Sequence, residues 1–322
     1  MKKLLLVILV SGAAFNVAAQ FEKIIQPSDL KQKTIITEPV TLNKGFLRAE
    51  IGVMYIVQDK YFNGKGKKEY YPVSMWGSKY QYTLGLRYGI TDRLEADVSL
   101  PLVNQRVENY FVVRMPVVNA DYSVSGKLKG RGIGDANLTL KYQIIPEKEK
   151  KITLTAFSDV TFPTGQKNPT DIKDFNDYKL PTGAGYFAAG IWIYARKIIY
   201  PYSFTTLLNY NYCFWGSKIM DAEAVTPVKF RAGDRFMASG SFNLHLNDWI
   251  ALANEIYYFH WGKGQEKNGI TTETDPSWTL DYNPRLVFQI RRFRIFEIVS
   301  VPMLGKDNSA DPAYSMTVQY TF

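Results

Sequence analysis

The regular alternation of apolar and polar residues along many short segments constrains the fold of this chain more than any other feature. Between residues 134 and 145 the even positions are apolar or small, and the odd positions are polar. The even set is Ala136, Leu138, Leu140, Tyr142 and Ile144, and the odd set is Asp135, Asn137, Thr139, Lys141 and Gln143. Because successive side chains of a strand point to opposite faces, a period of two predicts β-strands with one apolar face.

Segments of this kind recur along most of the chain, and counting them predicts about twelve strands, with ten or fourteen left open. The predicted strands are 45–59, 79–90, 94–104, 133–145, 151–162, 186–195, 202–215, 234–246, 250–261, 278–290, 294–304 and 313–322. Pro284 falls inside the tenth segment, where proline removes a hydrogen-bond donor from the ladder. The spacing predicts an all-β protein with one domain.

Two features favour a transmembrane, antiparallel, up-and-down β-barrel over a soluble sandwich, which also alternates. Aromatic residues edge the apolar faces, as in the girdles of membrane barrels. They are Tyr80, Tyr82, Tyr88, Tyr142, Tyr210, Tyr212 and Phe214. The connections also alternate between about three residues (91–93, 247–249, 291–293) and long loops (103–132, 163–185), as expected for short periplasmic turns and long outer loops.

The two ends of the chain indicate export to the bacterial outer membrane. Residues 1–19 combine Lys2 and Lys3, an apolar run and a small-residue finish, which is typical of a cleavable signal peptide. In residues 314–322 every second residue is large and apolar, so Tyr320 and Phe322 are predicted to be the signal that the barrel assembly machinery reads. The barrel is expected over 45–322. Part of the N-terminal periplasmic segment 20–44 is expected to narrow the periplasmic mouth, with a disordered leader as the alternative.

Composition excludes several other classes. After residue 19 no apolar segment approaches the ~18 residues of a membrane-spanning helix. The net charge of +9 becomes +7 without Lys2 and Lys3, which suits contact with outer-membrane lipids, whereas nucleic acid is the wrong partner for an exported protein. The single cysteine, Cys213, allows no internal disulfide.

Little in the sequence points to catalysis. The only histidines are His245 and His260, and neither lies in an esterase-like sequence. A serine–histidine hydrolase would need a serine from a neighbouring strand and an orienting acid. We therefore expect no enzyme activity, and we expect no cofactor and no metal site, because two histidines and one cysteine give no ligand cluster.

Charged residues recur on the polar face of the predicted strands. In a barrel they would line the lumen and either pair into a network or form facing acidic and basic belts. The lumen-lining candidates are Arg48, Glu50, Arg87, Glu95, Asp97, Asp135, Lys141, Asp159, Arg235, Glu255, Asp281, Arg285 and Glu297.

The first tight turn fixes a register that can be checked. If Ile90 and Leu94 face each other across it, paired positions sum to 184. Arg87 then lies opposite Asp97, within reach of an ion pair inside the lumen.

Three short motifs stand at strand ends: Gly-Ile-Thr-Asp-Arg-Leu-Glu at 89–95, Gly-Ile-Gly-Asp at 132–135 and Phe-Pro-Thr-Gly at 162–165. Together they resemble the outer-membrane barrel family named for the MetA pathway of phenol degradation. The resemblance implies a barrel channel that passes small hydrophobic or aromatic compounds. Pro-Thr-Gly recurs at 181–183, and the sequence offers no mechanism for the repeat.

Two functions remain open at this point. The first is a passive outer-membrane channel for small, apolar or aromatic solutes. The second is a structural or surface-binding barrel without transport activity, whose basic loops contact lipid phosphates. The loop cations are Lys60, Lys65, Lys67, Lys68, Lys127, Lys129 and Arg131.

Overall fold

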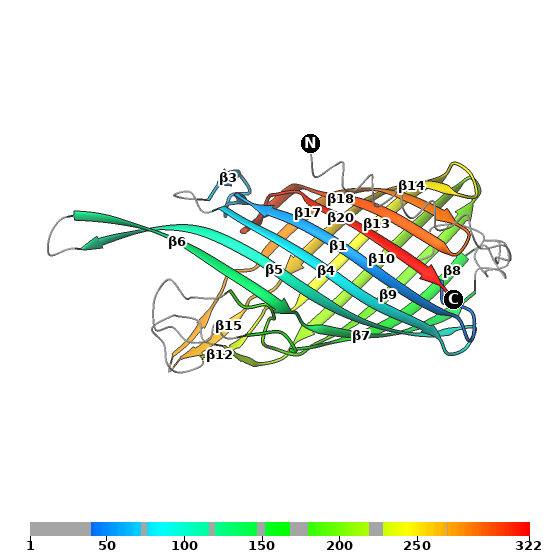
Figure 1. The fold of residues 1–322 in the computed structure, drawn as a ribbon, viewed down its shortest axis with the longest axis horizontal. Helices are drawn as coiled ribbons and strands as arrows, with labels where there is room; N and C mark the ends of the chain where they lie inside the picture. The colour runs from blue at the N-terminus through cyan, green and yellow to red at the C-terminus, as the bar shows by residue number, and fades with distance from the viewer. Residues whose placement is uncertain are drawn as a thin grey trace.

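Twelve strands form a closed antiparallel barrel in the computed structural model, which describes residues 40–71, 76–115, 120–146, 152–167, 180–218, 228–268 and 270–322 (Figure 1). The barrel strands are β1 (Leu47–Gln58), β4 (Trp76–Gly89), β5 (Leu94–Met115), β7 (Ala136–Ile145), β8 (Ile152–Phe162), β9 (Ala188–Ile199), β10 (Tyr202–Cys213), β13 (Arg235–His245), β14 (Ile250–Trp261), β17 (Ser277–Ile290), β18 (Phe293–Lys306) and β20 (Ala313–Thr321). The last strand pairs with the first, from Arg48–Thr321 to Ile56–Ala313, so the sheet has no open edge there. The predicted count of about twelve is confirmed.

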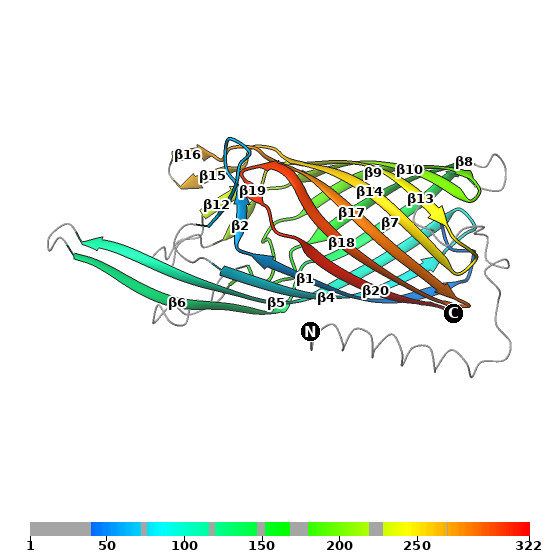
Figure 2. The same ribbon diagram turned by 90° about the horizontal axis from the view of Figure 1, so that it is seen from above.

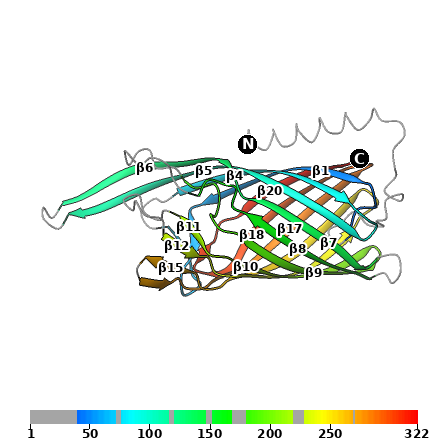
Figure 3. The same cartoon turned by 90° about the horizontal axis from the view of Figure 1, so that it is seen from below.

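The connections differ in length at the two ends of the barrel. Short turns and the C-terminus lie at one end, called the turn end below, and the longer loops lie at the opposite loop end (Figures 1 and 3). The loop end carries two small sheets. One contains β2 (Lys60–Phe62), β3 (Lys68–Tyr70) and β19 (Asn308–Ser309), and the other contains β11 (Gly216–Lys218), β12 (Val228–Arg231), β15 (Gln265–Asn268) and β16 (Ile270–Glu273). The described part of the chain contains no helix of the length and apolarity that crossing a membrane requires.

The long loop predicted at 103–132 is wrong. β5 continues to Met115 and pairs with β6 (Ala120–Ile133), and this ribbon projects beyond the loop end (Figure 2). Beyond the barrel a strand needs no continuous lipid-facing row, so the alternation used to find strands is lost there. The β-branched and aromatic run at 110–113 is the signal that could have indicated a strand.

The outer and inner faces of the wall differ as the alternation predicts. Along β10 the exposed and buried residues alternate without a break. Outward residues include Tyr202, Phe204, Leu208, Tyr210 and Tyr212, and inward residues are Ser203, Thr205, Leu207, Asn209, Asn211 and Cys213. Outward isoleucines such as Ile51 and Ile191 are 58% and 61% exposed. A continuous apolar belt of this kind is stable in lipid, so the barrel is a transmembrane one.

Pro284 lies within β17, as the sequence placed it, and disturbs the ladder locally. It pairs with Asn254 of β14. On the β18 side, the register runs from Tyr282–Val301 to Arg285–Ile298 without a pair at Pro284 or at the preceding Asn283. The missing N–H of proline explains the interruption.

The segment just before β1 fills the turn end of the lumen. Val40, Thr41 and Leu42 are almost fully buried. The Leu42 N–H donates to Glu95 Oε2 over 2.6 Å, and Lys141 Nζ donates to the Val40 carbonyl over 2.9 Å. Residues 1–39, which hold the predicted signal peptide and most of the predicted N-terminal segment, lie outside the described residues.

Candidate channel lumen

A charged wall covers the lumen side of β1, β4, β5 and β7. Arg87 lies between two acids: its Nη2 is 2.8 Å from Glu50 Oε2, and its Nε is 3.1 Å from Asp97 Oδ2. Next along the wall, Lys141 Nζ is 3.5 Å from Glu95 Oε1. Asp97 lies directly opposite Arg87, and Glu95 directly opposite Lys141, whereas Glu50 reaches Arg87 diagonally across the ladder. These candidates are therefore brought together as pairs.

A further ion pair lies on the other side of the barrel. Arg285 Nη2 of β17 is 2.6 Å from Glu255 Oε1 of β14, and both side chains are nearly fully buried. The hydroxyl of Tyr257 donates to the other Glu255 oxygen over 3.0 Å. Both carboxylate oxygens thus have partners, which a buried charge requires.

The remaining inward candidates have individual partners. Arg48 Nε donates to Thr321 Oγ1 across the closing strand pair, over 3.0 Å. Asp159 accepts from Asn137 Nδ2 over 3.2 Å and from the Trp192 indole N–H. Asp281 accepts from Ser300 Oγ over 3.3 Å. Arg235 begins β13 and pairs with Asn211 of β10, on the face that also carries Cys213.

The placement of Glu297 in the lumen is wrong. Arg294 of β18 faces inward and donates to Gln319, and a residue three positions further along a strand must point to the opposite face. Glu297 accordingly pairs with Leu286 and Met316 on the lipid side of the wall. Its charge alone favoured the lumen, but the parity of its position along β18 places it on the lipid side.

Asp135 holds the barrel wall and a loop together. β6 and β7 lie end to end along β5, with Gly134 and Asp135 between them. Asp135 Oδ1 accepts the Gly165 N–H over 3.0 Å, and its Oδ2 accepts the Ala184 N–H over 2.6 Å. One carboxylate therefore ties the loop that follows β8 to the loop that precedes β9.

The repeated Pro-Thr-Gly motif has a structural explanation at this junction. Thr164 Oγ1 donates to the Gly134 carbonyl over 2.8 Å, and Thr182 Oγ1 donates to the Ile133 carbonyl over 2.7 Å. The two glycines meet back to back, since a Cβ on Gly165 would lie 2.6 Å from the Gly183 Cα. We call Asp135 with residues 164–165 and 182–184 the double-turn clasp.

Aromatic side chains line the lumen opposite the charged wall, and the sequence predictions missed them. Tyr257, Phe259 and Trp261 follow one another on the inward face of β14. The ring centroids of Tyr257 and Phe259 lie 5.7 Å apart, and those of Phe259 and Trp261 lie 5.8 Å apart, both in stacked geometry. Phe157 of β8 and Trp192 of β9, next to the charged wall, stack at 5.1 Å, and both pack against the same buried cluster as Tyr257 and Phe259. The signal was present, because these β14 positions share the parity of Glu255.

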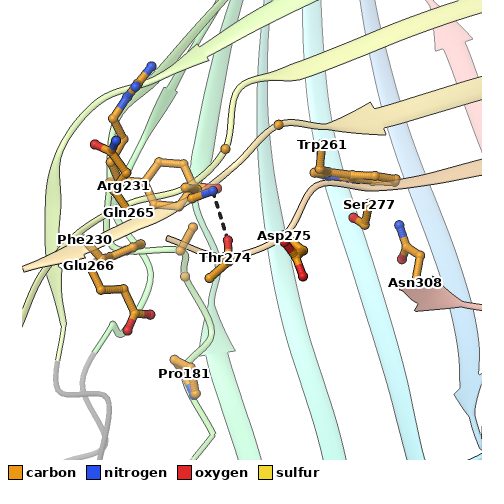
Figure 4. A pocket seen from close by; sticks show the side chains of 17 residues that line it. Pro181, Phe230, Arg231, Trp261, Gln265, Glu266, Thr274, Asp275, Ser277 and Asn308 are labelled. Atoms are coloured by element: carbon orange, nitrogen blue, oxygen red, sulfur yellow. Dashed lines mark hydrogen bonds between the residues drawn. The ribbon is translucent and has the colours of Figure 1, made fainter. Parts of the chain in front are cut away.

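Two cavities flank the double-turn clasp at the loop end. The larger, about 640 Å³, is bounded by Trp261, Ser277 and Asn308 on one side and by Phe230, Arg231 and Glu266 on the other (Figure 4). The smaller, about 330 Å³, lies against β4 and β5. Pro181, Gly183 and Ala184 line both cavities, so the clasp separates them.

The catalytic and metal-binding alternatives gain little from the geometry. His245 Nε2 does lie 3.1 Å from a cross-strand serine, Ser203. Both side chains are almost fully buried, and His245 Nδ1 has no hydrogen-bond partner among the described residues. A third, orienting group is therefore missing from a relay. Within the described ranges no three His, Cys, Asp or Glu side chains gather as metal ligands would.

Comparisons with known proteins agree with this architecture. The chain is similar to the crystal structure of an outer membrane channel from Pseudomonas putida F1, with a TM-score of 0.67 and 14% identity over 88% of this chain and 98% of that one. It is also similar to the translocator domain of the autotransporter NalP from Neisseria meningitidis, with a TM-score of 0.47 and 10% identity over 87% and 88% of the two chains. No protein-family model and no curated protein sequence matches the chain. The first likeness shows a shared barrel fold.

Proposed function

We propose that this protein is a passive channel of the bacterial outer membrane for small aromatic or apolar solutes. The observation that carries the proposal is the row Tyr257–Phe259–Trp261. It begins at the wall of the larger cavity, which Trp261 lines, and continues down the lumen face of β14. A solute entering at the loop end would meet a ring at every second residue.

The energetics of this row suit conduction. An aromatic pair in offset or edge contact contributes about 0.5–1.5 kcal/mol beyond its buried area. Several sites of that depth in sequence favour binding in the lumen while allowing a solute to leave each one, which conduction requires. The three residues are partly exposed, so part of the surface of the stacked rings can be reached from the lumen.

The charged wall supports the same function in another way. Arg87, Lys141 and Arg285 each have an acidic partner within the wall. Pairing reduces the free-energy cost of keeping these charges in a narrow lumen. It also leaves the charged groups less able to bind a passing solute. We infer that the wall stiffens the barrel while the aromatic side guides the solute.

Location and family belong to the proposal. In outer-membrane barrels the short turns face the periplasm, which would put the loop end outside the cell. Membership of the MetA-pathway barrel family, export by the N-terminal signal and assembly through Tyr320 and Phe322 would complete this account. The double-turn clasp supports the resemblance, because it explains two of the motifs that suggested it.

A planar bilayer experiment tests the proposal. Benzyl alcohol should interrupt the ion current of single wild-type channels, because a bound ring narrows the lumen. Replacing the two rings of the row that lie nearest the loop end (Phe259→Ala with Trp261→Ala) should remove these interruptions. Tyr258→Ala is the matched control, since Tyr258 lies between them in sequence but on the outward face. Equal interruption in all three proteins would exclude the aromatic row as the solute path.

One observation favours the alternative of a surface-binding barrel. Lys129 and Arg131 lie on the outward face of the β5–β6 ribbon, where Arg106 is already ion-paired with Glu108. Leu102 and Ile133 continue the same face toward the lipid belt. Such a position suits contact with the phosphates of lipid headgroups. Lys68 does not belong to this surface, because its ammonium group lies over the Phe62 ring and points to the Pro302 carbonyl.

A further inference from the structure

We propose that Lys79 and Gln81, in the smaller cavity of the lumen, bind the anionic oxygen of a solute, so that the solutes include small aromatic or apolar carboxylates and phenolates. This inference rests on the proposed channel function and adds a substrate class to it. The site lies beside the double-turn clasp, across from the aromatic row.

The register of β4 places Lys79 in the lumen. Lys79 and Gln81 share the parity of Arg87, which faces the acids of the charged wall. Their neighbours across the ladder are Ile56 and Gln105 for Lys79, and Met54 and Val103 for Gln81. None of these neighbours carries a negative charge.

Lys79 differs in its surroundings from the three lysine and arginine residues that form the ion pairs of the lumen. Arg87, Lys141 and Arg285 each form an ion pair with a wall carboxylate. Among the residues that the structure describes, Lys79 has no hydrogen-bond or ion-pair partner, and neither does the Gln81 side chain. A cation in a partly desolvated lumen gains from an anionic partner, and a solute can supply it.

The cavity around Lys79 fits a small anion with an apolar body. Its volume is about 330 Å³, within the usual range for small-molecule sites. Pro101 and Val103 provide apolar lining. Gln105 is held in place, because its amide donates to the Pro181 carbonyl over 2.6 Å. The site therefore combines an ammonium, a free amide and an apolar floor.

The acidic side chain that lines the same cavity is already engaged. Asp135 lines the same cavity, but both of its oxygens accept backbone N–H groups of the clasp. These donors partly neutralise the carboxylate and direct it into the loops. The Asp135 carboxylate, which is turned toward Gly165 and Ala184, therefore repels an anion at Lys79 less than a free carboxylate would.

Two solutes of similar shape test the site: benzoate, which carries the anionic group, and benzyl alcohol, which does not. The measurement is the concentration of each that halves the ion current in planar bilayers. Lys79→Gln should raise the benzoate concentration about tenfold, the scale of one hydrogen bond to a charged group, and leave benzyl alcohol unchanged. Lys79→Arg should stay near the wild type. Lys229→Gln removes an exposed lysine at the same end and is the control for net charge.

Each outcome decides the matter. Equal shifts for both solutes, no shift for either, or the same benzoate shift in Lys229→Gln would overturn the anion site. If that happens while benzyl alcohol still depends on Phe259 and Trp261, the proposed channel function stands. If benzyl alcohol never interrupts the current and benzoate does so through Lys79, the aromatic path falls and the anion site stands.

Discussion

Arg87 of β4 lies directly opposite Asp97 of β5, and the Arg87 Nε is 3.1 Å from the Asp97 Oδ2. The register predicted from the three-residue turn is confirmed, since Gly89 also faces Glu95. The structure adds Glu50, which contacts the same guanidinium from β1. One arginine therefore links three strands near the turn end.

Charge reversal at this position tests the coupling. Arg87→Glu would place a new carboxylate beside Glu50, Glu95 and Asp97 on one wall, so we expect lower stability and a shift of ion selectivity toward cations. Adding Asp97→Arg should recover part of the loss, with a coupling energy of about 0.5–3 kcal/mol because the sites are in contact. Urea unfolding in lipid and the reversal potential measure both effects. A double variant that shows only the sum of the single effects would contradict the pairing.

The double-turn clasp should be sensitive to a single methyl group. A Cβ on Gly183 would collide with Asp135 Oδ1 and lie 2.7 Å from the Gly165 Cα. We expect Gly183→Ala to lower the unfolding free energy by about 1–3 kcal/mol, as overpacking does. Gly240→Ala is the matched control, because its Cβ would meet no atom of the described residues within 4 Å, its two chain neighbours aside, and it should change stability by less than about 0.5 kcal/mol. Equal effects of the two substitutions would show that the clasp does not hold the wall.

The N-terminal residues at the turn end should restrict the ion path. Val40, Thr41 and Leu42 are buried against Glu95 and Lys141. Deleting residues 20–43, with the predicted signal peptide kept, should widen the lumen and increase single-channel conductance. The ion pair between Lys141 and Glu95 remains in the shortened protein, so the barrel should still assemble. Unchanged conductance would favour the disordered-leader alternative.

The loop end should respond to pH through Asp311. Its Oδ2 accepts the N–H groups of Asp59 and Lys60 over 2.7 and 2.8 Å. Burial, with the Asp59 carboxyl nearby, raises the pKa of Asp311 to about 6 from its usual 3.8. A raised pKa means that the folded state holds the proton on Asp311 more tightly than the unfolded state does. The protonated carboxyl therefore stabilises the folded loop end below about pH 4, and this stabilisation is lost as pH rises through about 6.

Hydrogen exchange measures this loss. Protection of the Lys60 amide, corrected for the intrinsic rate, should fall a few-fold between about pH 5 and about pH 7.5 in the wild type, on either side of the raised pKa. Asp311→Asn cannot ionise and should show the same protection at both values. The opposite trend in the wild type, or an equal fall in the variant, would mean that Asp311 does not control the contact.

Local pattern predicted the strands and one register, but not what depends on closure of the barrel. Alternation located the twelve barrel strands but not β6, and the tight turn fixed Arg87 against Asp97. Glu297 shows the limit of reading charge alone, because only its odd spacing from Arg294 reveals the lipid-facing side. The clasp could not be predicted, since Asp135, Gly165 and Gly183 meet only when β7, β8 and β9 are in place. The aromatic row follows from parity, because residues 257, 259 and 261 share the face of Glu255, but charge alone does not mark it as part of the lumen.

Liposome swelling tests the central claim most directly, with solutes that cross lipid slowly. The measurement compares the swelling rates with phenylalanine and with serine in vesicles that contain the purified protein. An aromatic path predicts faster swelling with phenylalanine, although it is the larger solute. In the double variant Phe259→Ala with Trp261→Ala, the smaller serine should give the faster swelling. No swelling with either solute, or faster swelling with serine in the wild type, would contradict a channel that selects aromatic solutes.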